Sequence, residues 1–270
     1  MPFEGTPTTT SARIKAVACA ALQRAGGDLA CRALVDWRCA HAVRILSTHR
    51  VVDSERASDD DRQDLERGCL SLAEFAARLM YLKRHYAPFA LPDYARRLRT
   101  GTLPPEHAVV LTFDDAFSDV YVHALPLLIE ASFPFTVFLT TGWVGCDGRM
   151  LSVAQIRDMA ERAAGLVSWG AHGVRHRPLT DMTIDDAERE IVESRKSVEG
   201  WVGGAIDLFC YPDGKFNDQV EDVLRKHGFT AACATGRSLN AGQVDPLALK
   251  RIPFEGESFA RFAFRVAGRT

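Results

Sequence analysis

The sequence predicts an α/β domain built on parallel strands. Short runs with strand composition alternate about seven times with segments in which apolar residues recur at helical spacing. Parallel neighbours need a crossover connection, and this alternation supplies one helix for each strand. Residues 109–113, V-V-L-T-F, are continuously apolar or β-branched, as in a buried strand. An open sheet and a barrel both fit this pattern, and both place chemically active side chains at the carboxyl ends of the strands.

The first 40 residues differ from the rest. Residues 1–10 have the composition of a disordered tail. Residues 12–24 carry apolar side chains on one helical face, and residues 31–39 form a candidate second helix. We therefore expect an N-terminal tail and helical extension at 1–40, followed by a catalytic domain at 41–270.

The predicted strands are enriched in β-branched and aromatic residues. Seven lie at residues 42–46, 109–113, 135–140, 165–169, 207–211, 230–234 and 249–253, and residues 86–91 form a candidate short strand. The predicted helices carry apolar stripes and capping signals, such as the Ser71–Glu74 capping box, Thr183 as an N-cap and Gly228 as a C-terminal stop. They begin at Ser71 and cover 92–99, 120–131, 152–162, 183–199 and 218–227. The charged stretch 53–68 is predicted to be an exposed loop.

Composition narrows the functional classes. The chain has 270 residues, of which 47% are hydrophobic, and its net charge of -2 gives no basic field that would attract nucleic acid. Its seven cysteines include no C-x-x-C pair, which favours a reduced intracellular protein over a disulfide scaffold. No stretch reaches transmembrane length, and the first residues lack the basic region of a signal peptide. We therefore expect a cytoplasmic protein.

Two adjacent carboxylates, Asp114 and Asp115, directly follow the central predicted strand. Like charges at the end of a buried strand are costly unless a cation compensates them, and a metal ion often does so. Neighbouring residues at a strand end also project differently, so one carboxylate can bind a metal while the other stays free as a base. The alternative is that the pair only starts the next helix.

A second polar motif, H-G-V-R-H, places His172 and His176 directly after another predicted strand. On a helical turn, residues four apart share a face, so both imidazoles can converge on one ion. Histidines at this spacing also arise by chance on surfaces. Together with a strand-end carboxylate, however, they make the two-histidine, one-carboxylate set of a hydrolytic metal site.

Three motifs taken in order resemble those of the polysaccharide deacetylase family, also called the NodB-homology or carbohydrate esterase 4 family. They are T-F-D-D-A at 112–116, H-G-V-R-H at 172–176 and F-C-Y-P-D-G at 209–214. The resemblance extends over residues 43–254. It implies a distorted (β/α)7 barrel, which agrees with the number of predicted elements.

The resemblance also implies a catalytic machinery. Asp115, His172 and His176 would bind a divalent metal, with zinc as the first choice and cobalt, nickel or iron as alternatives. Asp114 would be the general base that takes a proton from metal-activated water. The backbone N–H of Tyr211 would stabilise the oxyanion together with the metal.

Pro212 would shape the turn that presents the Tyr211 N–H. Two nearby motif positions depart from the family pattern. One of them is Asp213, which stands where an aromatic or small residue is usual. Asp213 could contact sugar hydroxyls or merely favour the turn. Ala116 replaces a frequent glycine, which is tolerable if its φ is negative. Trp143 is a candidate sugar-stacking residue, with core packing as the alternative.

The general acid is the least defined part of the machinery. No histidine follows Arg251, but one subgroup of the family has its acid histidine early in the chain, and His49 fits that arrangement. A structural histidine at a strand end is the alternative. The third motif lacks the arginine that often holds the base, so Arg251 is the candidate for holding Asp114, with Asp245 a candidate partner for His49. Surface ion pairs are the alternative for Arg251 and Asp245.

These residues predict a metal-dependent hydrolase that removes N-acetyl groups from a sugar in a polysaccharide or in a lipid- or nucleotide-linked glycan precursor. The alternatives are an inactive carbohydrate-binding relative, or a metallohydrolase that removes a formyl or O-acetyl group. The expected partner is the N-acetylated saccharide. The arginines of residues 96–99 are expected to form a solvated helix face, with peripheral contact to anionic lipid as an alternative.

Overall fold

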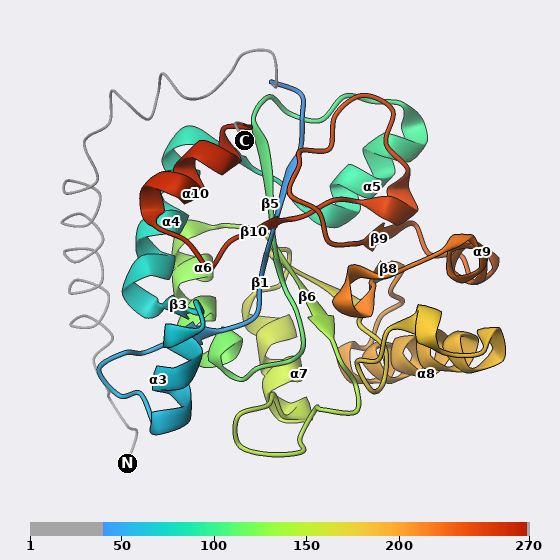
Figure 1. Ribbon diagram of the computed structural model, residues 1–270, viewed down its shortest axis with the longest axis horizontal. Helices are drawn as coiled ribbons and strands as arrows, with labels where there is room; N and C mark the ends of the chain where they lie inside the picture. Colours follow the sequence, from blue (N-terminus) through green and yellow to red (C-terminus); the bar gives the residue numbers. More distant parts are fainter. Residues whose placement is uncertain (1–39, 269–270) are drawn as a thin grey trace.

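The computed structural model describes residues 40–268, which form a distorted barrel of parallel strands surrounded by helices (Figure 1). The strands follow one another around the wall in the order β10-β1-β5-β6-β7-β8-β9. Their bounds are β1 (Arg44–Thr48), β5 (Ala108–Phe113), β6 (Phe135–Leu139), β7 (Val167–Ala171), β8 (Leu208–Cys210), β9 (Ala231–Cys233) and β10 (Ile252–Pro253). The short β4 (Ala87–Pro88) pairs with the start of β5.

The barrel closes through a single bridge between β9 and the segment that precedes β10. Residue Leu249, three positions before β10, forms an isolated parallel bridge with Cys233 of β9. Its N–H donates to the Ala232 carbonyl at 2.9 Å, and its own carbonyl accepts from the Ala234 N–H at 2.8 Å. The wall therefore has seven strands along its circumference, as the resemblance implies, and its seam lies between β9 and the segment leading to β10.

The helices pack outside this wall (Figure 1). Most of them begin at a side chain that accepts from the first turn, as at Ser71 and Ser152 with capping boxes and at Thr183 with a single bond. Gly101 and Gly203 end two of them in the left-handed conformation. The bounds are α4 (Leu72–His85), α5 (Leu91–Thr100), α6 (Leu125–Ala131), α7 (Val153–Arg162), α8 (Ile184–Val202), α9 (Asp218–Lys226) and α10 (Phe259–Val266).

The prediction of a loop at 53–68 is wrong in its second half. Residues Asp59–Glu66 form helix α3, which begins at a capping box between Ser58 and Asp61. Acidic residues in a first turn interact favourably with the helix dipole. The buried Arg50 then binds Asp61 and Asp64 of this helix at 2.8 and 2.6 Å. Arg149 also binds Asp64, at 2.7 Å, so two arginines hold this helix. It lies beside a two-stranded sheet of β2 (Val51–Val52) and β3 (Leu70–Ser71).

Two further differences concern other helices. The predicted helix 120–131 begins as a π-helix, η2 (Val120–Ala124), and continues as α6 from Leu125. Helix α10, which was not predicted, buries Phe262 and Val266 against the barrel. The predicted tail and helices within residues 1–39 lie outside the described residues. Within 40–268, none of the helices combines the length and hydrophobicity that crossing a bilayer requires.

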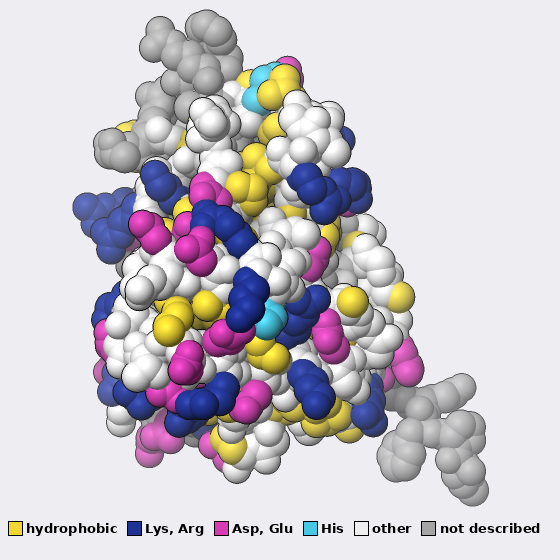
Figure 2. Space-filling view, turned by 90° about the vertical axis from the view of Figure 1, so that its right-hand side faces the viewer, with side chains coloured by type: hydrophobic (Ala, Val, Ile, Leu, Met, Phe, Trp, Pro, Cys, Tyr) yellow, Lys and Arg dark blue, Asp and Glu magenta, His cyan; other side chains and the backbone are white. Residues whose placement is uncertain are grey.

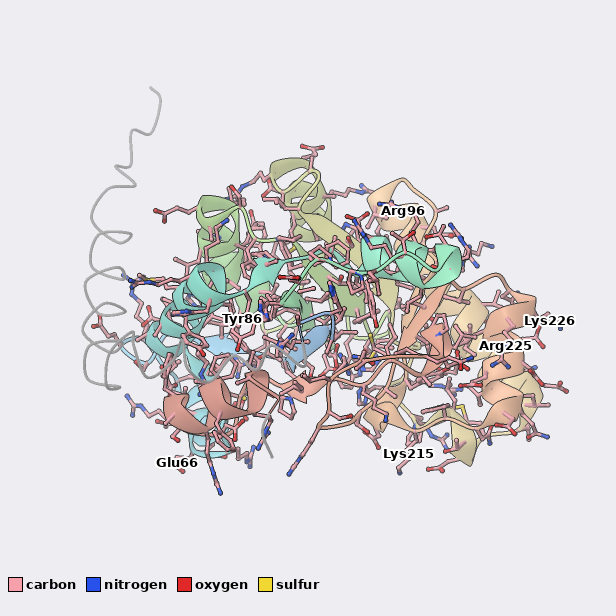
Figure 3. The ribbon with its side chains drawn as sticks, turned by 90° about the horizontal axis from the view of Figure 1, so that it is seen from above. Glu66, Tyr86, Arg96, Lys215, Arg225 and Lys226 are labelled. Carbon is pink, nitrogen blue, oxygen red and sulfur yellow. The ribbon has the colours of Figure 1, made fainter. Side chains whose placement is uncertain are left out.

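The face formed by α8 and α9 carries charges of both signs. Figure 2 shows Lys and Arg side chains interspersed with Asp and Glu side chains there. Lys226 of α9 lies 2.7 Å from Glu188 of α8, and Arg225 lies 2.9 Å from Asp222. In Figure 3, Arg225 and Lys226 lie at the outer edge of the molecule. Exposed pairs of this kind contribute little stability each, about 0–1 kcal/mol.

Candidate active site

The two carboxylates after β5 occupy a sharply bent backbone. Asp115 has φ of 80° and Ala116 has φ of 118°, both in the region that favours glycine. The expectation of a negative φ at Ala116 is therefore wrong. Such residues cost of order 1–3 kcal/mol each, and they persist where surrounding bonds fix the bend. Here the carbonyls of Asp115 and Ala116 accept from Thr140 and Leu151 at 2.9 and 2.8 Å, so two neighbouring loops hold the bend.

This bend sends the two side chains to different partners. Asp114 forms a two-point pair with Arg251, with Oδ1 2.7 Å from Nη1 and Oδ2 2.7 Å from Nη2. Both side chains are almost fully buried, at 2% and 5% exposure. Burial alone would raise the pKa of the Asp114 carboxyl, but the charges of Arg251 and His172 outweigh burial and hold that pKa well below its usual range. Asp114 is therefore a carboxylate at neutral pH.

Asp115 faces two imidazoles instead. Its Oδ1 lies 3.7 Å from Nε2 of His172 and 3.3 Å from Nε2 of His176. The three donor atoms lie within 4.8 Å of one another. They come from the ends of β5 and β7, two strands separated in the wall only by β6. The structure thus brings together the three residues expected to bind the metal.

The helical turn expected for H-x-x-x-H is absent, because residues 172–176 form a loop. Gly173 and His176 have φ of 75° and 54°, which no α-helix contains. The histidines converge because β7 ends at Ala171 and the chain then turns back over the barrel. The prediction that the two histidines lie close together is confirmed, but the helical turn expected to bring them together is wrong.

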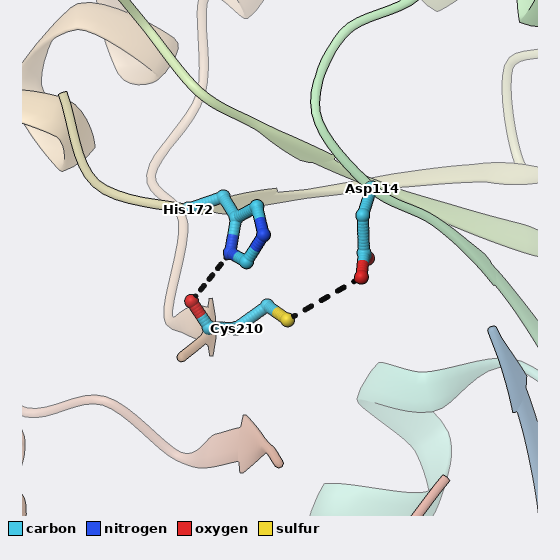
Figure 4. A group of neighbouring side chains, drawn as sticks. All are labelled: Asp114, His172 and Cys210. Carbon is cyan, nitrogen blue, oxygen red and sulfur yellow. Dashed lines mark hydrogen bonds between the residues drawn. The ribbon is translucent and has the colours of Figure 1, made fainter. Parts of the chain in front are cut away.

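The proton on His172 is fixed by its surroundings. Its Nδ1 lies 2.7 Å from the Cys210 carbonyl, which can only accept, so Nδ1 carries hydrogen and Nε2 presents a lone pair (Figure 4). Burial lowers the pKa of His172, with Asp114 and Asp115 opposing that shift only in part. A neutral imidazole with Nδ1–H bonded to a carbonyl is the usual form of a metal-ligating histidine.

The donor set fits a divalent cation. Asp115 Oδ1 is a buried oxygen for which the described residues provide no hydrogen-bond donor. An ionised oxygen left in this state is costly, and a cation between it and the two Nε2 atoms would compensate it. Two imidazoles and one carboxylate form the set of catalytic zinc sites, and they suit other first-row metals as well.

Cys210 lies between Asp114 and His172. Figure 4 shows its Sγ directed at Asp114, at 3.8 Å from Oδ2, while its carbonyl accepts from His172. Sγ also lies close enough to both residues to make a second potential donor set. Burial raises the pKa of this thiol well above its usual value, so Cys210 is a neutral thiol that contacts Asp114.

His49, at the end of β1, forms an ion pair that differs from the one expected. Its Nδ1 lies 2.7 Å from Oε1 of Glu255, and the other oxygen of that carboxylate, Oε2, accepts from Thr48 Oγ1 at 2.8 Å. Asp245 instead accepts from the Leu247 N–H at 2.8 Å and caps a short helix, so the proposed pairing of Asp245 with His49 is wrong. Burial alone would lower the pKa of His49, but the Glu255 hydrogen bond and the nearby carboxylates raise it to about 9.

The Tyr211 backbone N–H is not free to bind an oxyanion. It donates to the Cys233 carbonyl at 3.0 Å, as part of the contact between β8 and β9. The side-chain hydroxyl donates to the Leu247 carbonyl at 2.8 Å, so Tyr211 is a buried structural residue in this conformation. The expected oxyanion role therefore disagrees with the geometry.

The residues expected to contact substrate lie around this centre. Pro212 is buried in a short turn, η4 (Pro212–Gly214), and Asp213 is exposed there with φ of 56°, 3.9 Å from Lys215. Trp143 stacks on His176, with ring centroids 5.2 Å apart and an interplanar angle of 29°. Their contact with a sugar stays a prediction.

Sequence reasoning missed Glu255 and Glu190. Glu255 lies in a loop 206 positions after His49, and no local pattern marks it. Glu190 did carry a signal, because it shares the inward face of α8 with Ala187, Ile191 and Ser194. A glutamate at a buried helical position is rare unless it has partners.

Comparison with known proteins agrees with this geometry. The polysaccharide deacetylase model matches residues 102–232, which include both aspartates, both histidines and the turn at Pro212. Over this stretch, which is just under half of its length, the chain resembles the polysaccharide deacetylase family. Similar proteins include the poly-beta-1,6-N-acetyl-D-glucosamine N-deacetylase of Staphylococcus epidermidis, which is 23% identical over 233 residues, or 79% of each chain.

Other family relatives match over shorter stretches. The same-named deacetylase of Staphylococcus aureus (strain MSSA476) is 23% identical over 177 residues, and YxkH of Bacillus subtilis is 24% identical over 163 residues. The alignments span 61% and 57% of the lengths of these two proteins.

Solved structures share the fold. The deacetylase PplD of Streptococcus pyogenes superimposes with a TM-score of 0.75 at 20% identity, covering 84% of this chain and 99% of that one. IcaB of Ammonifex degensii gives a TM-score of 0.69 at 22% identity, covering 83% of this chain and 97% of that one. The distorted barrel is thus the family's architecture.

Proposed function

We propose that this chain is a divalent-metal-dependent N-deacetylase, with zinc the first choice of metal, that acts on an N-acetylated sugar. The substrate would be a polysaccharide or a lipid- or nucleotide-linked glycan precursor. The observation that carries the proposal is the unpartnered Asp115 Oδ1 facing the Nε2 atoms of His172 and His176, with the ionised Asp114 alongside.

Asp114 has the properties of a general base with low intrinsic strength. Its pKa lies well below the usual range, so it is ionised at any physiological pH but accepts a proton from bulk water poorly. A cation held by Asp115, His172 and His176 would acidify water and polarise the acyl carbonyl. Asp114 would then take the proton from the attacking water while Arg251 keeps the carboxylate in place.

In this proposal, His49 would complete the reaction as general acid. Its raised pKa keeps it protonated at neutral pH, and 42% of its side chain is exposed, so a substrate nitrogen can reach it. As the C–N bond of the acetamide breaks, the His49 imidazolium would donate a proton to the leaving amine. The products are acetate and a free amino sugar.

Two measurements test the proposal. Elemental analysis of the purified chain should find about one zinc-like ion, which His172→Ala should lose. Acetate release should then be screened across N-acetylated saccharides with added zinc, cobalt, nickel or iron, starting with β-1,6-linked N-acetylglucosamine oligomers because the relatives named above act on that polymer. A metal-free wild-type chain would refute the metal site, and retained activity after chelation would refute the metal requirement.

The same screen separates the alternative functions. Release of formate or of O-linked acetate without amine formation would identify a different acyl group. Saccharide binding without any release would identify a carbohydrate-binding relative. The intact Asp114–Arg251 and His49–Glu255 pairs favour turnover, since a binding module needs neither an ionised base nor a protonated acid beside a donor set.

If the substrate is a lipid- or nucleotide-linked precursor, the proposal also includes a cytoplasmic location for this protein. A lipid- or nucleotide-linked substrate would be met inside the cell, whereas a finished cell-surface polymer would not. Cell fractionation with an antibody to the native chain tests this point, and recovery from the medium or the cell surface would restrict the substrate to the polymer.

A further inference from the structure

The loop that carries His172 and His176 has no regular structure to support it. Because residues 172–176 are not helical, their backbone N–H groups lack the intrahelical acceptors of an H-x-x-x-H helix. Gly173 and His176 also have positive φ values of 75° and 54°. Bonds from outside the loop must therefore fix the direction in which the two imidazoles point.

One buried carboxylate accepts three of these bonds. Glu190 of α8 is 3% exposed, and its Oε2 accepts from the N–H groups of Val174 and Arg175 at 2.7 and 3.0 Å. Its Oε1 accepts from Arg175 Nε at 2.6 Å. Every hydrogen bond described for Glu190 thus goes to the segment between the two histidines.

The opposite side of the loop is held by backbone contacts. The N–H groups of Thr141 and Gly142 donate to the carbonyls of Gly173 and Val174 at 3.0 and 2.9 Å. The approach is close, since a Cβ at Gly142 would lie 2.5 Å from the Val174 oxygen, and one at Gly173 would lie 3.3 Å from Glu190 Oε2. The loop is therefore clamped between the end of β6 and helix α8.

We propose that Glu190 is a positioning residue for the metal donors: it holds the 172–176 loop in the one conformation that turns both Nε2 atoms toward Asp115. The inference rests on the proposed metal function of this site. Glu190 touches neither a donor atom nor a place where substrate would bind, so it acts through the backbone of Val174 and Arg175. Groups that orient metal ligands in this way typically change metal affinity by 10–100-fold when removed.

Helix α8 offers a matched control in Glu199. Its Oε1 also accepts from a backbone N–H, that of Ile206 at 3.1 Å, and from Arg195 Nε at 3.0 Å. These contacts lie at the far end of the helix from the 172–176 loop. If substitution merely destabilised the helix or the domain, changes at Glu190 and at Glu199 would have similar effects. A positioning effect would appear only for changes at Glu190.

The experiment measures Zn²⁺ affinity of the full chain by chelator competition, with amide hydrogen exchange of the metal-free chain. Glu190→Ala should weaken Zn²⁺ binding by about 10–100-fold and speed exchange in the segment 172–176. Glu190→Gln can still accept from the two N–H groups, but its neutral amide oxygen accepts more weakly than a carboxylate, so a smaller loss is expected. Arg175→Gln leaves both backbone bonds in place, so it should bind Zn²⁺ like the wild type, as should Glu199→Gln.

Either of two results would overturn the inference. In the first, folded Glu190→Gln and Glu190→Ala bind Zn²⁺ as tightly as Glu199→Gln. In the second, amide hydrogen exchange in residues 172–176 is unchanged by the substitutions at Glu190. If Glu190→Ala does not fold, Glu190→Gln and the exchange measurement decide alone. Failure of the proposed function would look different, because the wild-type chain would then bind Zn²⁺ and release no acetate while the variants kept their order of affinity.

Discussion

Two ion pairs flank the donor set, and they are built in opposite ways. Asp114 and Arg251 form a two-point pair that is 2% and 5% exposed. His49 and Glu255 form a one-point pair that is 42% and 19% exposed. The buried pair holds Asp114, the proposed base, ionised and in one position. The open pair keeps His49, the proposed acid, protonated and partly exposed.

Their pH dependence also has opposite signs. The lowered pKa of Asp114 means that its contribution to folding stability is present above the unfolded value of about 3.9 and is lost as the pH falls further. His49 has a pKa raised to about 9, so its contribution is complete below about pH 6.5 and is lost as the pH rises through 9. Acid thus weakens one pair and alkali the other.

The largest effect is expected from Asp114→Asn. Asparagine keeps the shape but cannot accept the proton of the attacking water, so acetate release should fall by about 10²–10⁴-fold or more. Zn²⁺ content should stay near wild type, because Asp115 and the histidines are untouched. Loss of the metal together with activity would mean that Asp114 is a ligand rather than a base. Parallel elemental analysis and acetate assays make this distinction.

Arg251→Met should reduce the free energy of unfolding by about 3–5 kcal/mol, because it leaves a buried carboxylate without its partner. It should also raise the pKa of Asp114, so that the acid limb of the activity profile moves to higher pH. Arg62→Met, at the exposed pair with Asp59 on α3, is the control and should cost about 1 kcal/mol or less. If denaturant unfolding gives the two variants equal losses of unfolding free energy, the buried pair contributes no more stability than the exposed one.

Glu255→Gln tests the open pair by titration. Without the carboxylate, the pKa of His49 should fall below 9, and the alkaline limb of kcat against pH should move down with it. His49→Gln should abolish that limb and lower turnover by about 10²-fold or more. The exposed His41 provides the control, since His41→Gln should change neither. An alkaline limb that survives in His49→Gln would assign it to another group.

The smallest effect is expected from Cys210→Ala. The thiol contacts Asp114 only weakly, at 3.8 Å, and Arg251 already fixes both carboxylate oxygens. Turnover should remain near wild type, and the unfolding free energy should fall by about 1 kcal/mol for the lost packing. A large drop in kcat at unchanged stability would show that the buried pair depends on the sulfur as well.

The barrel and the location of the site could be predicted from the sequence because both depend on local signals. Strand composition and helix caps are properties of short segments, and parallel topology brings strand ends together. Asp114, Asp115, His172 and His176 could therefore be placed at one edge of the sheet before any coordinates. Their catalytic and metal-binding roles stay predictions until the measurements above are made.

The errors arose where distant segments decide the outcome. Choosing Asp245 rather than Glu255 for His49 requires knowing how the chain turns after β10, which no residue pattern shows. The Tyr211 N–H is occupied by β9, a neighbour set by sheet order. Helix α3 is the exception, since its Ser58–Asp61 capping box was visible but outweighed by the run of charges.

The seam of the barrel has a consequence for biosynthesis. Arg251 and Glu255 both follow the bridge at Leu249 in the sequence. During synthesis, the three proposed metal donors Asp115, His172 and His176 are therefore made before the two counter-ions. In the proposed mechanism, the partners that hold Asp114 and His49 come from the segment that is translated after all the residues they serve.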